Sequence, residues 1–207
     1  KNIEAIPVEA TRIGSLKLSG QFSGAHSGEM TARGTIVSGI GDADINLHKN
    51  SNNLFEGTIT TPQFDLRQLT GNDSFGKIIA DLTLTGQLRS VGMPDLNVNG
   101  KVSQFDYNGY PFSNINLNGN YASQGYKGQL QIDDPNIVAS LEGDFLLGRN
   151  GQQHHLNLSG VIDHFVPQAL GLSDQWGSAV FTGNIQADVT AKTLQTAIGT
   201  LRISNFS

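Results

Sequence analysis

The sequence predicts an all-β protein: a long curved β-sheet that forms an open groove from repeat-like strands, with two short helical segments. Apolar and polar residues alternate with a period of two through most of the 207 residues, which places one set of side chains on each face of a strand. Turn sequences such as Tyr107-Asn108-Gly109 separate the alternating runs at short spacing. A five-residue pattern (apolar, any, apolar, any, Gly) recurs at 16–20, 30–34, 82–86, 96–100, 115–119, 139–143, 156–160 and 179–183.

The glycine of this pattern falls on the apolar face of each predicted strand. Glycine makes up 25 of the 207 residues, about 12% against a usual ~7%. Because glycine inside a strand weakens it, its recurrence there needs a reason. It permits a sharp bend or bulge in a sheet that fills its own core, or it leaves space on the apolar face for a foreign apolar guest. The residues alone leave both interpretations open.

Two short helical segments are expected between strands. The first covers residues 64–69, where Asp65 and Gln68 have the spacing of a capping box. The second covers residues 165–170, where Pro167 suits a first helical position and Gly171 suits a helix stop.

The two helical segments also predict an internal repeat. Phe64 and Phe165 lie 101 positions apart, as do Gly76 and Gly177. We therefore expect a super-repeat with halves 1–100 and 101–207 inside one unit, 1–207. The chain begins at Lys1 and ends within a strand-like stretch, so we expect it to be an interior fragment of a longer repetitive β-groove protein.

The charge and the cysteine content of the chain exclude some classes of partner and site. Charged residues make up 15% of the chain, the net charge is −5 and the basic residues form no cluster, so no nucleic-acid partner is expected. The sequence has no cysteine, which excludes disulfides, thiolate metal sites and cysteine nucleophiles.

No arrangement of residues indicates catalysis or metal binding. His154 and His155 are adjacent, so a strand directs them to opposite faces, which is wrong for chelating one ion. Asp42 and Asp44 resemble the start of a calcium loop, but Leu47 stands where an EF-hand needs glycine. Nothing assembles a nucleophile, a base and a stabilising group. We expect no enzyme, no metal and no cofactor.

The segment 94–147 carries a more distinctive order of elements. It contains the strand 96–100, a Phe105-x-Tyr107-x-Gly109-Tyr110 turn, the strand 115–121, a Tyr126-x-Gly128 strand, the turn 133–136 (Asp-Asp-Pro-Asn) and the strand 141–145. This run resembles the AsmA-like/TamB (translocation and assembly module) family of Gram-negative envelope proteins, and the likeness extends over roughly residues 55–190.

The resemblance implies a long curved sheet shaped like a taco, with an apolar interior. It implies a parent protein anchored in the inner membrane, crossing the periplasm, with a role in phospholipid transport and in outer-membrane biogenesis and assembly. An outer-membrane barrel protein would be a partner through parts that this fragment lacks.

The apolar face and the resemblance together give a hypothesis of function: a lipid-binding groove segment that holds a phospholipid or another acyl-chain lipid. The alternative is a closed structural β-repeat, such as an adhesin stalk or a module that binds glycan or protein through tyrosines. The predicted lipid-facing residues are Ile78, Leu82, Leu84, Leu96, Val98, Ile115, Leu117, Leu130, Leu141, Leu156, Leu158, Phe181 and Ile185.

Overall fold

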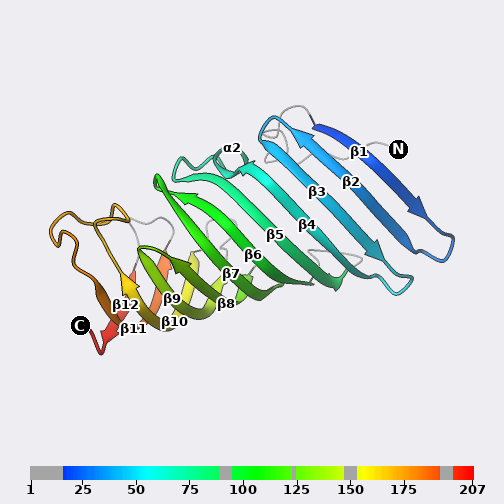
Figure 1. Ribbon diagram of the computed structural model, residues 1–207. Helices are drawn as coiled ribbons and strands as arrows, with labels where there is room; N and C mark the ends of the chain where they lie inside the picture. Colours follow the sequence, from blue (N-terminus) through cyan, green and yellow to red (C-terminus); the bar gives the residue numbers. More distant parts are fainter. Residues whose placement is uncertain (1–15, 89–94, 123–124, 147–152, 192–197) are drawn as a thin grey trace.

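A computed structural model describes residues 16–88, 95–122, 125–146, 153–191 and 198–207. They form one antiparallel sheet of twelve strands, in which each strand pairs with its neighbours in sequence (Figure 1). The all-β prediction is confirmed. The strands are β1 (Leu16–Gly24), β2 (Met30–Ser38), β3 (Gly41–Lys49), β4 (Leu54–Asp65), β5 (Phe75–Gln87), β6 (Asp95–Tyr107), β7 (Tyr110–Ala122), β8 (Gly125–Asp134), β9 (Ile137–Leu146), β10 (His154–Phe165), β11 (Phe181–Ala191) and β12 (Ile198–Ser204).

The sheet is a single layer that is not closed into a barrel, so β1 and β12 are its two edges (Figure 1). The described elements pack extensively only against their neighbours in the chain, and the short helix α2 (Leu66–Thr70) packs on β5. Residues 100 and 101 lie inside β6, so the two halves of the expected super-repeat are continuous in one sheet, and the repeat itself stays a prediction. In the described parts, no helix has the length and apolarity needed to cross a membrane.

Only one of the two predicted helical segments forms a helix. Asp65 caps α2, because its carboxylate accepts hydrogen bonds from the backbone N–H groups of Arg67 (2.9 Å) and Gln68 (3.4 Å). The prediction for 165–170 is wrong: Phe165 ends β10, and the following residues make hydrogen-bonded turns. Val166 stands where the repeat would place the capping Asp65, and its side chain has no acceptor for the first N–H groups.

The sheet is concave on its apolar face, and glycine makes the curvature possible. At Gly100 an added Cβ would overlap the carbonyl oxygen of Asp81 and lie 2.9 Å from the Cα of Leu82. A Cβ at this position would project from the apolar face of the sheet. The overlap therefore means that the backbone of the neighbouring strand is bent toward the apolar side. The same overlap with a neighbouring carbonyl occurs at Gly20, Gly34, Gly57, Gly86, Gly100, Gly143, Gly160 and Gly199.

Irregular strand pairing adds to the bend along a line across the sheet. The register shifts between Thr61 and Phe64 on β4, between Ile79 and Ala80 on β5, and after Ile162 on β10. Such bulges bend a strand and increase its twist. A cluster of buried apolar residues lies beside this line: Ala80, Val102 and Ile115 are 2%, 5% and 7% exposed. In a single layer, this burial comes from curvature, because neighbours on the same face fold over these side chains.

A buried carboxylate ties the hairpin of β6 and β7 to the turn between β8 and β9. Asp134 is 3% exposed and accepts hydrogen bonds from the Tyr110 hydroxyl, the Ser113 backbone N–H (2.9 Å) and hydroxyl (2.8 Å), and the Asn136 backbone N–H (2.9 Å). Burial by itself raises the pKa of Asp134, but these hydrogen bonds outweigh it and hold the pKa below its ordinary value. Burial and the bond to Asp134 raise the pKa of Tyr110.

We expect Gly100→Ala to destabilise the protein by about 1–3 kcal/mol, because the new methyl group meets backbone that cannot move aside. Gly24→Ala is the matched control, since its Cβ would lie 3.8 Å from the carbonyl oxygen of Glu29, an ordinary van der Waals contact. This control should be neutral or stabilising by about 0.4–1 kcal/mol. Urea unfolding measures both. Equal effects of the two substitutions would contradict the role given to glycine in the curvature.

We expect Asp134→Asn to cost about 1–3 kcal/mol at neutral pH, because an amide leaves some of the buried donors without an acceptor. The exposed neighbour gives the control, Asp133→Asn, which should change stability little.

The pH dependence of this difference has a defined sign. Because folding lowers the pKa of Asp134, its contribution is complete above the unfolded value of about 3.9 and is lost as pH falls through the folded value. Urea midpoints of the wild type and of Asp134→Asn should therefore converge below about pH 4. A gap that stays constant down to the acid limit of the measurement would show that the carboxylate charge is irrelevant.

Candidate apolar binding groove

Cross-strand pairing aligns the apolar residues of the concave face into continuous rows. One row, which we call the first row, crosses all twelve strands without a charged side chain. It consists of Gly20, Gly34, Ile45, Ile59, Leu82, Gly100, Leu117, Leu130, Leu141, Gly160, Ile185 and Ile203. Rows of this kind form when every strand keeps the same alternation and the register never slips by one residue.

A second row runs beside the first and is also uncharged. It consists of Phe22, Ala32, Leu47, Gly57, Leu84, Val98, Gly119, Gly128, Gly143, Leu158, Ala187 and Leu201. We call the concave surface formed by the two rows and their apolar flanks the groove. The intervening residues of each strand, such as Asn97, Asn99 and Lys101 on β6, are exposed on the opposite, polar face.

The structure places all thirteen predicted lipid-facing residues on the groove face. Eight of them lie in the two rows, while Leu96 and Leu156 lie in the next row outward and Ile78 and Phe181 lie on the far side of the bulges. Twelve of the thirteen are partly exposed. Ile115 differs, because it is 7% exposed and its neighbours cover it, so it forms the floor beneath the groove surface.

The thirteen predicted residues leave out three aromatic side chains of the groove face. Tyr121, Tyr126 and Phe145 align in a row with Leu96 and Leu156. Their alternation with glycine and leucine was a usable signal, but their alignment depends on strand register across hairpins.

The buried hydroxyl and ring of Tyr126 shape part of the groove. Its ring lies over Gly119 and Gly128, where an added Cβ would overlap it. The Tyr126 hydroxyl oxygen is buried without a hydrogen-bond partner in the described structure, and burial raises its pKa. Here glycine accommodates a side chain of the groove as well as the bend.

A cavity of about 370 Å³ opens on the groove face where β10, β11 and β12 meet. Its lining combines Ile162, Ile185 and Ile203 from the strands with aromatic residues from the segments that follow β10 and β12, and no charged residue lines it. Trp176 packs edge-on against Phe181 at 5.5 Å between ring centroids, and Phe206 stacks on Phe181 at 5.1 Å. We call this feature the aromatic cavity.

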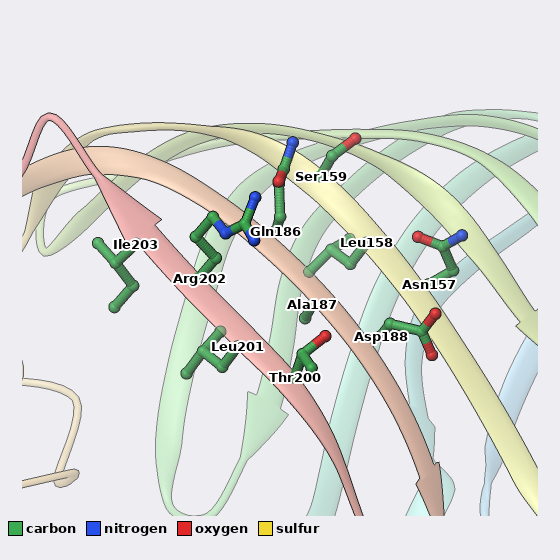
Figure 2. Close-up of a pocket in the computed structure, with 10 residues that line it drawn as sticks. All are labelled: Asn157, Leu158, Ser159, Gln186, Ala187, Asp188, Thr200, Leu201, Arg202 and Ile203. Atoms are coloured by element: carbon green, nitrogen blue, oxygen red, sulfur yellow. The ribbon is translucent and has the colours of Figure 1, made fainter.

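A wider hollow of about 800 Å³ lies at β10–β12 and is lined mainly by polar groups (Figure 2). Ser159, Gln186, Asp188, Thr200 and Arg202 contribute to it from three neighbouring strands. This hollow is the larger of the two spaces, but it is open to solvent. Its lining mixes acidic, basic and neutral polar side chains, so it indicates no particular class of ligand. We therefore place the candidate site in the groove and not in this hollow.

The histidine and aspartate residues considered as possible metal ligands lie on the strand faces that the alternation predicts. His155 pairs with Asp188 at 3.0 Å on the polar face, while the His154 ring stacks on Phe145 on the groove face. Asp44 accepts a hydrogen bond from the Thr35 hydroxyl at 2.6 Å, as expected of a polar strand face. Within the described ranges, no three acidic, histidine or cysteine side chains gather in a way that could hold a metal ion.

Comparison of the chain with protein-family models, with curated proteins and with solved structures gave no match.

Proposed function

We propose that this chain is a lipid-binding groove segment that holds the acyl chains of a phospholipid or a related lipid. One observation carries the proposal: two uncharged apolar rows cross all twelve strands on the concave face, and no second layer covers them in the described structure. Monomeric proteins rarely leave a contiguous apolar surface of this extent uncovered, and ligand-binding grooves are one of the sites that such surfaces mark.

The physical chemistry of an acyl chain matches this surface. Transferring each methylene group from water to an apolar lining is favourable by about 0.8 kcal/mol. Acyl chains have no polar atoms to satisfy, so a lining without charges and with few hydroxyls imposes no desolvation cost. Twelve strands at ~4.8 Å spacing give a track on the order of 50 Å long, which is longer than one lipid.

The wider cellular role that we propose follows from the resemblance of residues 94–147 to the AsmA-like/TamB family. We place the protein in the periplasm of a Gram-negative bacterium, in a parent anchored in the inner membrane. Its role there is phospholipid transport and outer-membrane biogenesis, with an outer-membrane barrel protein as a partner of other segments. What supports this is the unclosed curved sheet with an apolar interior, the same architecture that the resemblance implies.

The alternative of a closed structural β-repeat has less support. That hypothesis requires a filled core and exposed tyrosines for contact with glycan or protein. The sheet is open, and Tyr110 is partly buried, with its hydroxyl held by Asp134 and by the Asn136 amide at 2.9 Å. Tyr107 is likewise packed, stacked on Phe105 at 6.2 Å between ring centroids.

We expect the triple substitution of Leu84, Leu117 and Leu158 by Asp to reduce the affinity for a fluorescent fatty acid about tenfold or more. Each carboxylate would have to lose water beside the acyl chain, and 1.4 kcal/mol of lost binding energy already amounts to a factor of ten. Fluorescence titration of the purified chain measures the affinity, and circular dichroism confirms that the sheet remains.

The matched control adds the same three charges to the polar face, at the exposed positions directly before each leucine: Thr83→Asp, Asn116→Asp and Asn157→Asp. This variant should bind as the wild type does. The proposal fails if the wild type neither binds the fatty acid nor carries lipid that mass spectrometry detects after extraction. It also fails if both triple variants bind equally well.

A further inference from the structure

We propose that the aromatic cavity is the site where the groove encloses a hydrocarbon tail, with Trp176 at its mouth. This inference rests on the proposed function and adds to it, because it assigns one defined holding site within an otherwise open track. Along most of its length the groove covers a bound chain from one side only. At β10–β12, side chains from outside the sheet complete the enclosure.

The enclosure depends on two segments that the strands hold in place. After β12 the chain turns so that the Ser207 backbone N–H donates to the Thr182 carbonyl (3.3 Å), and the Thr182 N–H donates to the Ser207 carbonyl (3.1 Å). The two hydroxyls also pair at 2.7 Å. This clamp places Phe206 over Phe181. From the other side, Pro167 is fully buried in the turn after β10, and Trp176 follows in the same connection.

The chemistry of the lining selects a hydrocarbon chain as the occupant. No charged residue lines the cavity, and the polar groups of Thr182 are already paired with Ser207. Asn184 also contributes to the lining, but it alternates with Gly183 and Ile185 on β11, so its side chain is directed to the polar face. A hydrocarbon chain needs no hydrogen-bond partner, so it can occupy this lining without leaving a polar atom unsatisfied. The cavity also continues the groove, because Ile185 and Ile203 belong to the first row.

The size of the cavity fits part of a lipid tail. Its volume of about 370 Å³ lies within the ~300–1,000 Å³ typical of ligand pockets. An apolar cavity of about 150 Å³ in another protein suffices to bind benzene. The aromatic cavity therefore has space for a stretch of acyl chain, while the head group stays at the open groove.

The chain contains its own reporter for this site. Trp176 is the sole tryptophan of the sequence, lines the cavity and is 54% exposed. Bromine atoms on a bound chain quench tryptophan only at close range. Titration of the whole chain with stearic acid brominated along its chain should therefore cause a saturable loss of tryptophan emission. Unbrominated stearic acid should cause no such loss, and vesicles of brominated phosphatidylcholine test whether the tail comes from a membrane lipid.

Two variants test the location. Ile203→Phe fills the cavity from the edge strand β12, where the side chain is already half exposed and the substitution does not threaten the fold. We expect it to weaken quenching about tenfold or more. Thr200→Phe adds the same ring to the same strand on the polar face, at the hollow of Figure 2, and should leave quenching unchanged.

The outcomes separate this inference from the function on which it rests. Quenching by either the fatty acid or the vesicles, lost in Ile203→Phe alone, supports the aromatic cavity and identifies the source of the tail. A chain that binds the fluorescent fatty acid but shows no quenching by any brominated probe overturns the cavity and leaves the groove intact. Equal loss of quenching in both variants also overturns it. Absence of lipid binding in every arm overturns the groove itself.

Discussion

The close approach of neighbouring backbones at the strand glycines is the constraint on which the rest of the structure depends. At Gly20 and Gly34 two glycines face each other across β1 and β2, and a Cβ on either would lie within 2.7 Å of the other's Cα. Without this approach the sheet would be flatter. A single-layer sheet has no other layer against which to pack, so its curvature is the source of the burial at Ala80 and Val102. Curvature thus substitutes for a second layer.

The two interpretations of the glycines, bending and space for a guest, are therefore not alternatives. At Gly100, Gly143 and Gly160 the space beside the Cα is occupied by neighbouring backbone, so bending is the direct reason for glycine there. The bend of a sheet that never closes then produces a concave apolar surface. The space for a guest comes from the trough as a whole and not from the missing side chain at any single position.

The sequence was informative wherever one strand or one turn determines the structure. Alternation predicted which residues face the groove, Asn108-Gly109 predicted the tight turn that the positive φ angles of both residues confirm, and Asp65 predicted a helix cap. These features depend on residues within about one turn or one strand of each other. The same local reasoning failed at 165–170, because turn chemistry at Pro167 and Gly171 was mistaken for a helix that lacks a capping side chain.

Features that depend on register between strands could not be derived from the sequence. Asp133 and Asp134 are equivalent in sequence, yet one is exposed and the other is buried against groups from Tyr110 and Ser113, more than twenty positions away. The aromatic cavity has the same origin. Trp176 and Phe206 are separated in the chain by β11 and β12, yet both pack against Phe181 and line the same cavity.

The division of the groove into an open track and an enclosed end has a physical consequence for a bound lipid. Hydrophobic contact is non-directional and scales with the area removed from water, so a lipid held as we propose would find apolar contact at every strand of the two rows. Enclosure by Trp176 and Phe206 removes more of the chain from water at one place and adds aromatic contacts from a second side. The strands alone form an extended apolar surface. The residues outside the sheet, Trp176 and Phe206, would make one place on that surface the preferred site for the lipid tail.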